Sequence, residues 1–349
     1  MKKLGLILLA FIFGGSLLWN SCSNDFELTD TWQEFPVVYA ILSPGDNAYF
    51  VRVEKAFLDP KTSAYTIADI ADSLYYPENA ITVYLQKVGT TNLYQMYRVD
   101  GNLEGLKRDT GIFANTPNWL YKIKPNEIGG GLQVGATYKL IIKRADGKPD
   151  ITAETTIPKP FSLQSPNPTT TPPRINFLGI IPTTFRWSHD ENAVFFNVDL
   201  TIPYREEISG QATKYDTIHW RAAANIQSPS PTAQSTLTQV LGTDFYTVMR
   251  KRLIERYGSL ESIPAASRYF GNLTIDIEGG GKEIREYLLT ADANSGLTGA
   301  EILQTYTNLS EGYGIFSAKN RSTKSGFKIE DTTIDSMKLN PITRDFNFK

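Results

Sequence analysis

The sequence offers few side chains for general-base or thiol chemistry, namely Cys22, His189 and His219. Ser188, His189 and Asp190 supply the three residue types of a hydrolytic triad. Consecutive residues of an extended chain point to opposite faces, whereas the side chains of a triad must converge within hydrogen-bond distance. We therefore interpret this segment as the end of a strand and the start of a turn. His219 is expected to be a packed or hydrogen-bonded strand residue rather than a base.

Other catalytic and cofactor motifs are absent from the sequence. There is no G-x-S-x-G, no H-E-x-x-H and no Walker loop, and the glycines at 279–281 lack the spacing and the Lys-Ser/Thr of a phosphate-binding loop. We expect those glycines in a turn or loop, and Asp276 and Glu278 on the solvated face of a strand. Residues 190–192 lack the spaced acidic pattern of a calcium loop. We therefore predict no catalytic residue, no cofactor and no metal site, so that the protein is not an enzyme.

The N-terminal segment has the pattern of a secretory signal peptide. Two lysines precede an uncharged run over residues 4–19, which is shorter than the about 20 apolar residues of a spanning helix. Cys22, the only cysteine, follows this run behind the small residue Ser21, and the arrangement resembles a lipobox. It departs from that pattern at Trp19, where leucine is more usual. We predict that residues 1–21 are removed and that Cys22 is lipidated, and the alternative is a buried core thiol.

Charge and cysteine content restrict the partners and the source of stability. The net charge is −2, and the one dense run of basic residues is Arg250-Lys251-Arg252. A phosphate backbone requires a concentrated basic face, so we do not expect nucleic acid as a partner. A single cysteine that carries lipid leaves none for an internal disulfide. Stability must come from packed cores, which 349 residues with 41% hydrophobic residues can form.

Period-two alternation of apolar and polar residues dominates the chain up to Pro158. It is clear at 81–86 and at 138–143, and turn sequences separate such runs. We predict that residues 35–158 form an immunoglobulin-like β-sandwich. Residues 22–34 are polar and have no strong period, and we interpret them as a lipidated tether that holds the sandwich away from the membrane.

The second half of the chain combines strand and helix patterns. Prolines and small polar residues fill 159–173, which we predict to be a linker between domains. Apolar residues recur at four-residue steps over 243–257 and Gly258 follows them, which predicts an amphipathic helix. Residues 282–291 predict a second, shorter helix. We therefore predict a mainly β protein, in which residues 174–349 form a β-rich α+β domain with one or two helices.

Four aromatic residues lie in stretches where no alternation explains them. They are Tyr75, Tyr76, Trp119 and Tyr121. Exposed aromatic side chains in loops are typical of binding surfaces, so we predict that these residues contact a ligand or partner. The alternative is a small satellite core beneath long loops.

Several short segments resemble one known family. They are VVYAILSP at 37–44, AYFVRVEKAF at 48–57, TTIP at 155–158, FRW at 185–187 and GYGIFS at 312–317. Through them the chain resembles the Bacteroidota outer-membrane lipoprotein family called domain of unknown function 4249. Members are often found beside TonB-dependent outer-membrane receptors, so the resemblance implies a binding or interaction partner of such a receptor in nutrient uptake. It implies no biochemical activity and no functional residue.

The resemblance also implies a localisation, namely lipid-anchored in the outer membrane and exposed at the cell surface. Bacteroidota lipoproteins bound for the outer face carry acidic residues after the lipidated cysteine, and Asp25 and Glu27 match that pattern. An ordinary solvated linker would have a similar composition. Two other functions stay open, namely a structural cell-surface lipoprotein and a cryptic hydrolase.

Four short segments resemble the O-glycosylation sequon of exported Bacteroidota proteins. Their hydroxyl residues are Ser73, Thr217, Thr332 and Ser336. Modification requires an accessible hydroxyl. We expect Ser73, Thr332 and Ser336 in loops, where they would be accessible, and Thr217 in a strand.

Overall fold

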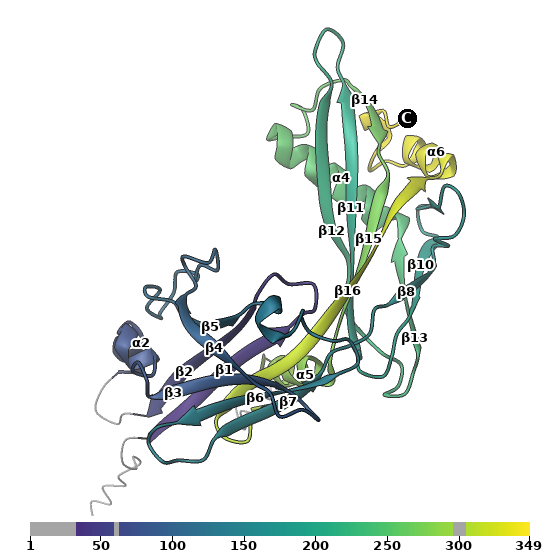
Figure 1. Cartoon of the computed structure of the whole chain (residues 1–349). Coiled ribbons are helices and arrows are strands. Elements are labelled where there is room, and N and C mark those ends of the chain that lie inside the picture. Colours follow the sequence, from purple (N-terminus) through teal and green to yellow (C-terminus); the bar gives the residue numbers. More distant parts are fainter. Residues whose placement is uncertain (1–32, 59–62, 296–304) are drawn as a thin grey trace, which may run out of the picture.

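The protein consists of two lobes built mainly from β-strands (Figure 1). A computed structural model describes residues 33–58, 63–295 and 305–349. The predicted signal peptide, the predicted lipidation site Cys22 and most of the predicted tether lie outside the described residues. The strands form a mixed sheet of 13 strands and a second sheet of three strands, which confirms the prediction of a mainly β protein.

The N-terminal lobe is an immunoglobulin-like sandwich, as the alternation predicts. Its strands are β1 (Gln33–Leu42), β2 (Tyr49–Leu58), β3 (Ile81–Lys87), β4 (Leu93–Asp100), β5 (Trp119–Ile123), β6 (Thr137–Arg144) and β7 (Ile151–Thr156). The order β1-β2-β5-β4 followed by β3-β6-β7 is that of the two sheets of a constant-type immunoglobulin domain. Alternate residues such as Val83, Leu85 and Leu140 are fully buried in one core.

Strand β4 joins the two layers of the sandwich into one continuous sheet. Its residues 93–96 pair with β3, and its residues 97–100 pair with β5. A strand that changes partners in this way forms a corner between layers. The loops of this lobe carry the short helices α2 (Ala64–Ala68), α3 (Ala71–Leu74) and η1 (Pro125–Ile128).

The C-terminal lobe packs a long sheet against a small sheet. The long sheet contains β11 (Phe195–Glu207), β12 (Lys214–Gln227), β14 (Ser267–Phe270) and β15 (Leu273–Gly280). The small sheet contains β8 (Ser162–Ser165), β10 (Pro182–Ser188) and β13 (Ser235–Leu241). The other elements are β9 (Arg174–Ile175), α4 (Gly242–Tyr257), α6 (Asp331–Leu339) and η2 (Arg344–Phe346). The apolar face of β11, with Phe196, Val198 and Leu200, is fully buried against Trp187 and Phe245.

One strand, β16 (Tyr313–Ile329), belongs to both lobes. Its residues 313–318 pair in parallel with β1, and its residues 319–327 pair antiparallel with β15. Figure 1 shows β16 passing from one lobe into the other. The predicted ranges 35–158 and 174–349 therefore differ from the structure, because a strand from the second range completes the sheet of the first.

The predicted linker at 159–173 contributes to the C-terminal core. It contains β8, and the side chains of Phe161 and Leu163 are buried. The ring of Phe161 packs edge-on against that of Phe196, with centroids 5.5 Å apart. The prolines of the segment are compatible with this arrangement because none of them lies within β8. The segment is therefore more than a linker, because part of it packs into the C-terminal core.

Two helices confirm the helical patterns of the sequence. Helix α4 covers the predicted range, and Gly258, with φ of 86°, ends it as its N–H donates to the carbonyl of Ile254 at 2.7 Å. Helix α5 (Lys282–Ser295) is longer than predicted and lies against the N-terminal lobe (Figure 1), where Tyr287 packs against Tyr39. Helix α6 was not predicted.

Candidate functional site

The side chains of Ser188, His189 and Asp190 do not converge. His189 is buried, and its two ring nitrogens lie 2.8 Å from the carbonyl of Asp190 and 2.8 Å from the hydroxyl of Thr236. The carboxylate of Asp190 accepts a hydrogen bond from Asn192 instead, at 2.9 Å. The segment is a strand end followed by a turn, as predicted, and its imidazole is held by structural hydrogen bonds.

Two of the three glycines at 279–281 lie in a strand rather than in the predicted turn. Gly279 and Gly280 are the last residues of β15, so the prediction of a turn or loop is wrong for these two. A Cβ at Gly279 would lie 2.6 Å from the ring of Phe161, and one at Gly280 would lie 2.7 Å from the side chain of Ile284. At Gly279 the buried rings of Phe161 and Phe196 leave no room for a Cβ, whereas at Gly280 the end of the Ile284 side chain would have to shift.

The acids of β15 lie on its polar face, as predicted. Glu278 pairs with Lys319 at 2.9 Å, and Asp276 accepts a hydrogen bond from Thr323. Within the described ranges, no group of three or more His, Cys, Asp and Glu side chains is placed to hold a metal ion. In the same part of the chain, no helix is both long enough and apolar enough to cross a membrane.

Three of the four aromatic residues that we expected at a contact surface are buried. Tyr75, Tyr76 and Tyr121 are 4%, 6% and 8% exposed. Trp119 is half-buried, and the guanidinium of Arg98 lies 4.4 Å from its ring centroid. Tyr75 and Trp119 belong to a small cluster that is separate from the main core. The prediction of an exposed contact is therefore wrong for the three tyrosines, and the alternative of a satellite core describes this cluster.

The predicted glycosylation residues lie in helices rather than loops. Ser73 is in α3, Thr332 and Ser336 are in α6, and Thr217 is in β12, as predicted for the last of them. The hydroxyl of Ser336 accepts a hydrogen bond from Tyr246 at 2.8 Å. Thr332 is exposed, so its modification stays a prediction on grounds of access.

An apolar groove runs along the outer face of β1 and β2, and we call it the Tyr39 groove. It consists of two cavities of about 380 Å³ each, which share Tyr39 and Arg52. One cavity is bordered by α2, α3 and the loop before β5, and the other by α5. Its apolar lining includes Ile41 and Phe113, which are 45% and 44% exposed. A continuous exposed apolar surface is typical of a docking site.

Tyr39 at the centre of this groove is a neutral hydrogen-bonding group. Partial burial, together with the neighbouring hydroxyl of Tyr287, raises the pKa of Tyr39 to about 12. The two rings lie edge to face with centroids 6.3 Å apart. The groove therefore combines an apolar surface with a phenol hydroxyl that stays protonated at physiological pH.

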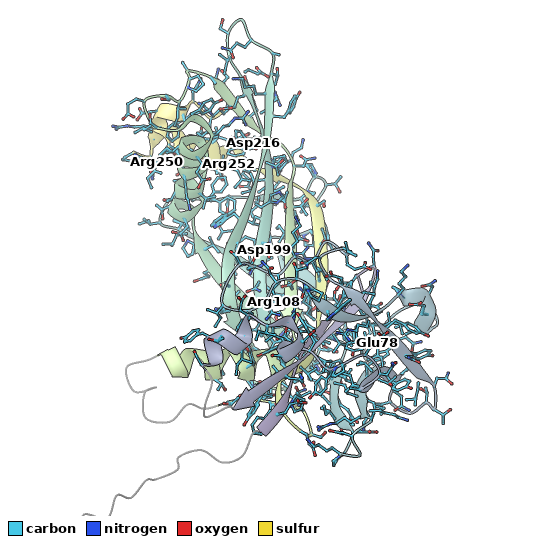
Figure 2. The ribbon with its side chains drawn as sticks, turned by 90° about the vertical axis from the view of Figure 1, so that its left-hand side faces the viewer. Glu78, Arg108, Asp199, Asp216, Arg250 and Arg252 are labelled. Carbon is cyan, nitrogen blue, oxygen red and sulfur yellow. The ribbon has the colours of Figure 1, made fainter. Side chains whose placement is uncertain are left out.

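Ion pairs hold one wall of the groove in place. The carboxylate of Glu54 is nearly buried and accepts hydrogen bonds from Arg52 at 2.9 Å and from Arg108 at 2.6 Å. Arg108 (Figure 2) also donates to the hydroxyl of Tyr75 at 3.1 Å and lies 5.0 Å from the ring centroid of Phe113. The loop that carries Phe113 is thus fixed to the sheet, so the groove has a preformed shape.

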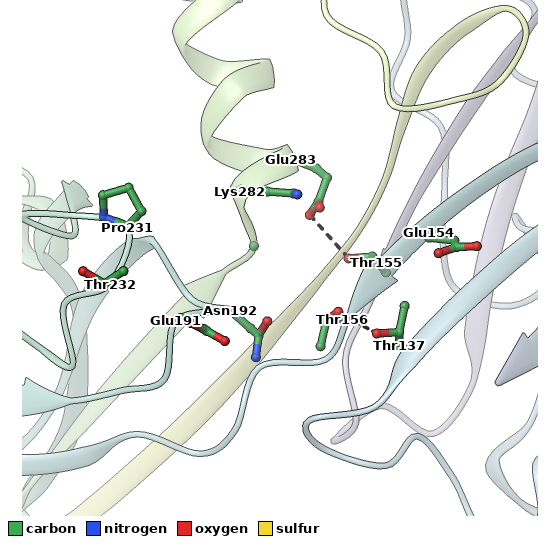
Figure 3. Close-up of a pocket in the computed structure, with 11 residues that line it drawn as sticks. Thr137, Glu154, Thr155, Thr156, Glu191, Asn192, Pro231, Thr232, Lys282 and Glu283 are labelled. Carbon is green, nitrogen blue, oxygen red and sulfur yellow. Dashed lines mark hydrogen bonds between the residues drawn. The ribbon is translucent and has the colours of Figure 1, made fainter. Parts of the chain in front are cut away.

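A third cavity, of about 460 Å³, lies where the two lobes meet, and we call it the junction pocket (Figure 3). Strand β7, a loop of the C-terminal lobe and the start of α5 each contribute a carboxylate, from Glu154, Glu191 and Glu283. Asn192 and Lys282 also line it, together with several threonine hydroxyls. This lining suits a ligand with polar groups, because carboxylates, hydroxyls and an amide from several elements converge on it.

The basic run at 250–252 lies on α4 (Figure 2). Arg252 donates to both carboxylate oxygens of Asp216 at 2.9 and 3.0 Å, and Lys251 lies 3.8 Å from Glu255. Burial would raise the pKa of Asp216, but the bonds from Arg252 and other donors lower it to about 2. Two of the three basic side chains are therefore offset by nearby carboxylates.

Comparison with known proteins identifies a family but no activity. The model of a family described as a domain of unknown function, number 4249, matches residues 24–325. No curated protein matches the sequence. The solved C-terminal globular domain of oligosaccharyltransferase from Pyrococcus abyssi is 8% identical, with a TM-score of 0.22, and the similarity covers 64% of this chain and 42% of that one. A similarity of that size supports no conclusion about this chain.

Proposed function

The chain belongs to the family called domain of unknown function 4249, and from that premise we propose that it is a lipid-anchored binding protein of a Bacteroidota outer membrane. We propose that its partner is a TonB-dependent receptor and that the two act together in nutrient uptake at the cell surface. In this proposal the protein acts by contact with the receptor and carries out no chemical step.

The Tyr39 groove is the observation that supports a protein partner most directly. Its rim exposes large apolar side chains, and burying such surface stabilises a complex by about 25 cal/mol per Å². The groove lies on the lobe that contains β1, and a tether ending at residue 34 would attach to that strand. A lipid anchor would therefore hold this lobe, and the groove with it, close to a receptor in the same membrane.

A charge placed in the groove should disrupt the complex. We expect tagged native protein, extracted in mild detergent, to co-purify with a β-barrel receptor, and we expect Ile41→Asp to lower the receptor recovered about tenfold or more, as loss of a central apolar contact does. Ile180→Asp is the matched control, because Ile180 is 83% exposed on the other lobe. Recovery of a lone monomer from native membranes, or equal receptor recovery with Ile41→Asp, would count against the proposal.

The lipid anchor has its own test at Cys22. We expect native protein to incorporate labelled fatty acid, and we expect Cys22→Ala to lose the label and appear in the soluble fraction. The physical reason is that each buried methylene of an acyl chain contributes about 0.8 kcal/mol to membrane binding. Ser23→Ala serves as the control and should keep the label. A Cys22→Ala protein that stays bound to envelopes as tightly as the native protein would contradict the anchor.

A further inference from the structure

The junction pocket contains a buried carboxylate with one unused oxygen. Glu283 is 6% exposed. Its Oε2 accepts hydrogen bonds from Ser317 at 2.9 Å and from Thr155 at 3.4 Å, the second of which is drawn in Figure 3. Its Oε1 receives no hydrogen bond from the described part of the chain, and no described basic side chain lies within 4.0 Å of the carboxylate. A buried charge of this kind is costly unless a partner offsets it.

The fold places this carboxylate at the pocket and keeps it there. A Cβ at Gly281 would lie 2.7 Å from Oε2 of Glu283, so glycine at that position leaves the space that the carboxylate occupies. Glu283 lies in the first turn of α5, where the backbone N–H groups stabilise negative charge. Thr155 and Ser317 belong to β7 and β16, so three elements position the group. Because no described residue donates a hydrogen bond to Oε1, we expect this oxygen to accept one from a group that enters the pocket.

The other lining residues also favour a positively charged guest. Glu154 and Glu191 add two carboxylates, of which Glu154 pairs with Lys139 at 3.4 Å, and Lys282 is the one basic residue of the described lining. The amide nitrogen of Asn192 donates to Asp190 at 2.9 Å, which leaves the amide oxygen of Asn192 as an acceptor. Acceptors and negative charge therefore exceed donors and positive charge. Because the described acids form no metal-binding group, the charge is spread over the pocket rather than focused on one point.

We infer that the junction pocket binds a small organic cation that carries one or more ammonium groups. An ammonium group donates up to three hydrogen bonds, and Oε1 of Glu283 is an acceptor of the pocket lining that receives none from the described residues. The carboxylate of Glu191 and the amide oxygen of Asn192 complete the acceptors on the C-terminal side. The volume of about 460 Å³ lies within the range of small-molecule sites, which often form between domains. This inference is independent of the Tyr39 groove and of the receptor.

Two probes of the same shape test the charge of the ligand. The full-length protein in detergent is titrated calorimetrically with butane-1,4-diammonium and with butane-1,4-diol, at low ionic strength. We expect the diammonium ion to bind about tenfold or more tightly than the diol, because charged hydrogen bonds contribute more than neutral ones. Equal affinities for the two probes would overturn the inference. The inference would also be overturned, in favour of a metal site, if calcium chloride displaced the diammonium ion at concentrations below that of the diammonium ion itself.

Variants test whether Glu283 is the group that binds the ammonium ion. Glu283→Gln keeps a carbonyl oxygen for Ser317 and Thr155 but turns an amide nitrogen toward the pocket, so affinity for the diammonium ion should fall about tenfold or more. Glu261→Gln, at an exposed position, is the control and should bind as the native protein does. Unchanged affinity in a folded Glu283→Gln protein would overturn the inference. If that variant does not fold, exposed Glu191→Gln must lower the affinity severalfold for the inference to stand.

Discussion

Replacing Arg268 by alanine should lower the free energy of unfolding by about 3–5 kcal/mol. The side chains of Arg268 and Glu206 are 1% and 0% exposed, and Nε of Arg268 lies 2.8 Å from Oε1 of Glu206. The guanidinium also donates to the backbone carbonyls of Phe346, at 2.7 Å, and Pro264, at 3.1 Å. Alanine would leave a buried carboxylate oxygen and two carbonyls without these donors, which is costly in a low-dielectric interior.

The control for this change is an arginine–carboxylate pair at the surface. Arg221 contacts both carboxylate oxygens of Asp199 at 2.9 and 3.2 Å, but its side chain is 53% exposed. Arg221→Ala should cost about 1 kcal/mol or less, because water replaces the lost partner. Urea unfolding of the two variants measures the difference. Equal losses of stability would contradict the role of burial. The double change Arg268→Met with Glu206→Gln should recover part of the loss, since position 206 then carries no buried charge and Arg256 keeps its ion pair with Asp216.

The sandwich of the N-terminal lobe could be predicted because its information is local. In β3 and β6 every second residue is apolar, and the structure buries those residues against one core. Alternation fixes which face of a strand is buried, and short turns favour pairing with a neighbour in sequence. Strand β16 carries no comparable signal. Its partner β1 lies at the other end of the chain. Parallel strands are not joined by a short turn, so no turn sequence predicts this pairing.

The errors in the predicted contact surface have a different physical origin. Tyr75 and Tyr76 have no alternating neighbours, yet Tyr75 packs with α3 and the loop before β5, and Tyr76 packs into the core of the sandwich. No local sequence pattern predicts either contact. The junction pocket escaped prediction for a related reason. Thr155, Glu283 and Ser317 come from separate segments, and each of them alone is an ordinary polar residue. One local signal was present, since Gly281 lies two residues before Glu283, but a run of glycines more often forms a turn.

Gly314 lies in β16 where this strand pairs with β1. Replacing Gly314 by alanine should lower the free energy of unfolding by about 4 kcal/mol or more. Gly314 is paired with Val38 of β1, and a Cβ at Gly314 would lie 2.0 Å from the carbonyl oxygen of Val38. Its φ of 116° is also unfavourable for alanine. Since backbone blocks the Cβ, the alanine can be accommodated only if β16 moves away from β1. That movement would open the edge of the N-terminal sheet.

Gly326 is the control that separates the clash of the Cβ from the strain of a positive φ. It lies in the same strand with φ of 94°, and a Cβ there would have nothing within 4 Å. Gly326→Ala should cost only the backbone strain, about 1–2 kcal/mol. Urea unfolding gives the two free energies, and hydrogen exchange locates the change, which we expect in the amides of β1 for Gly314→Ala alone. Equal free energies, or protected β1 amides in the Gly314 variant, would mean that β16 does not hold the lobes together. If the two variants differ as expected, the parallel pairing of β16 with β1 makes the two lobes one folding unit.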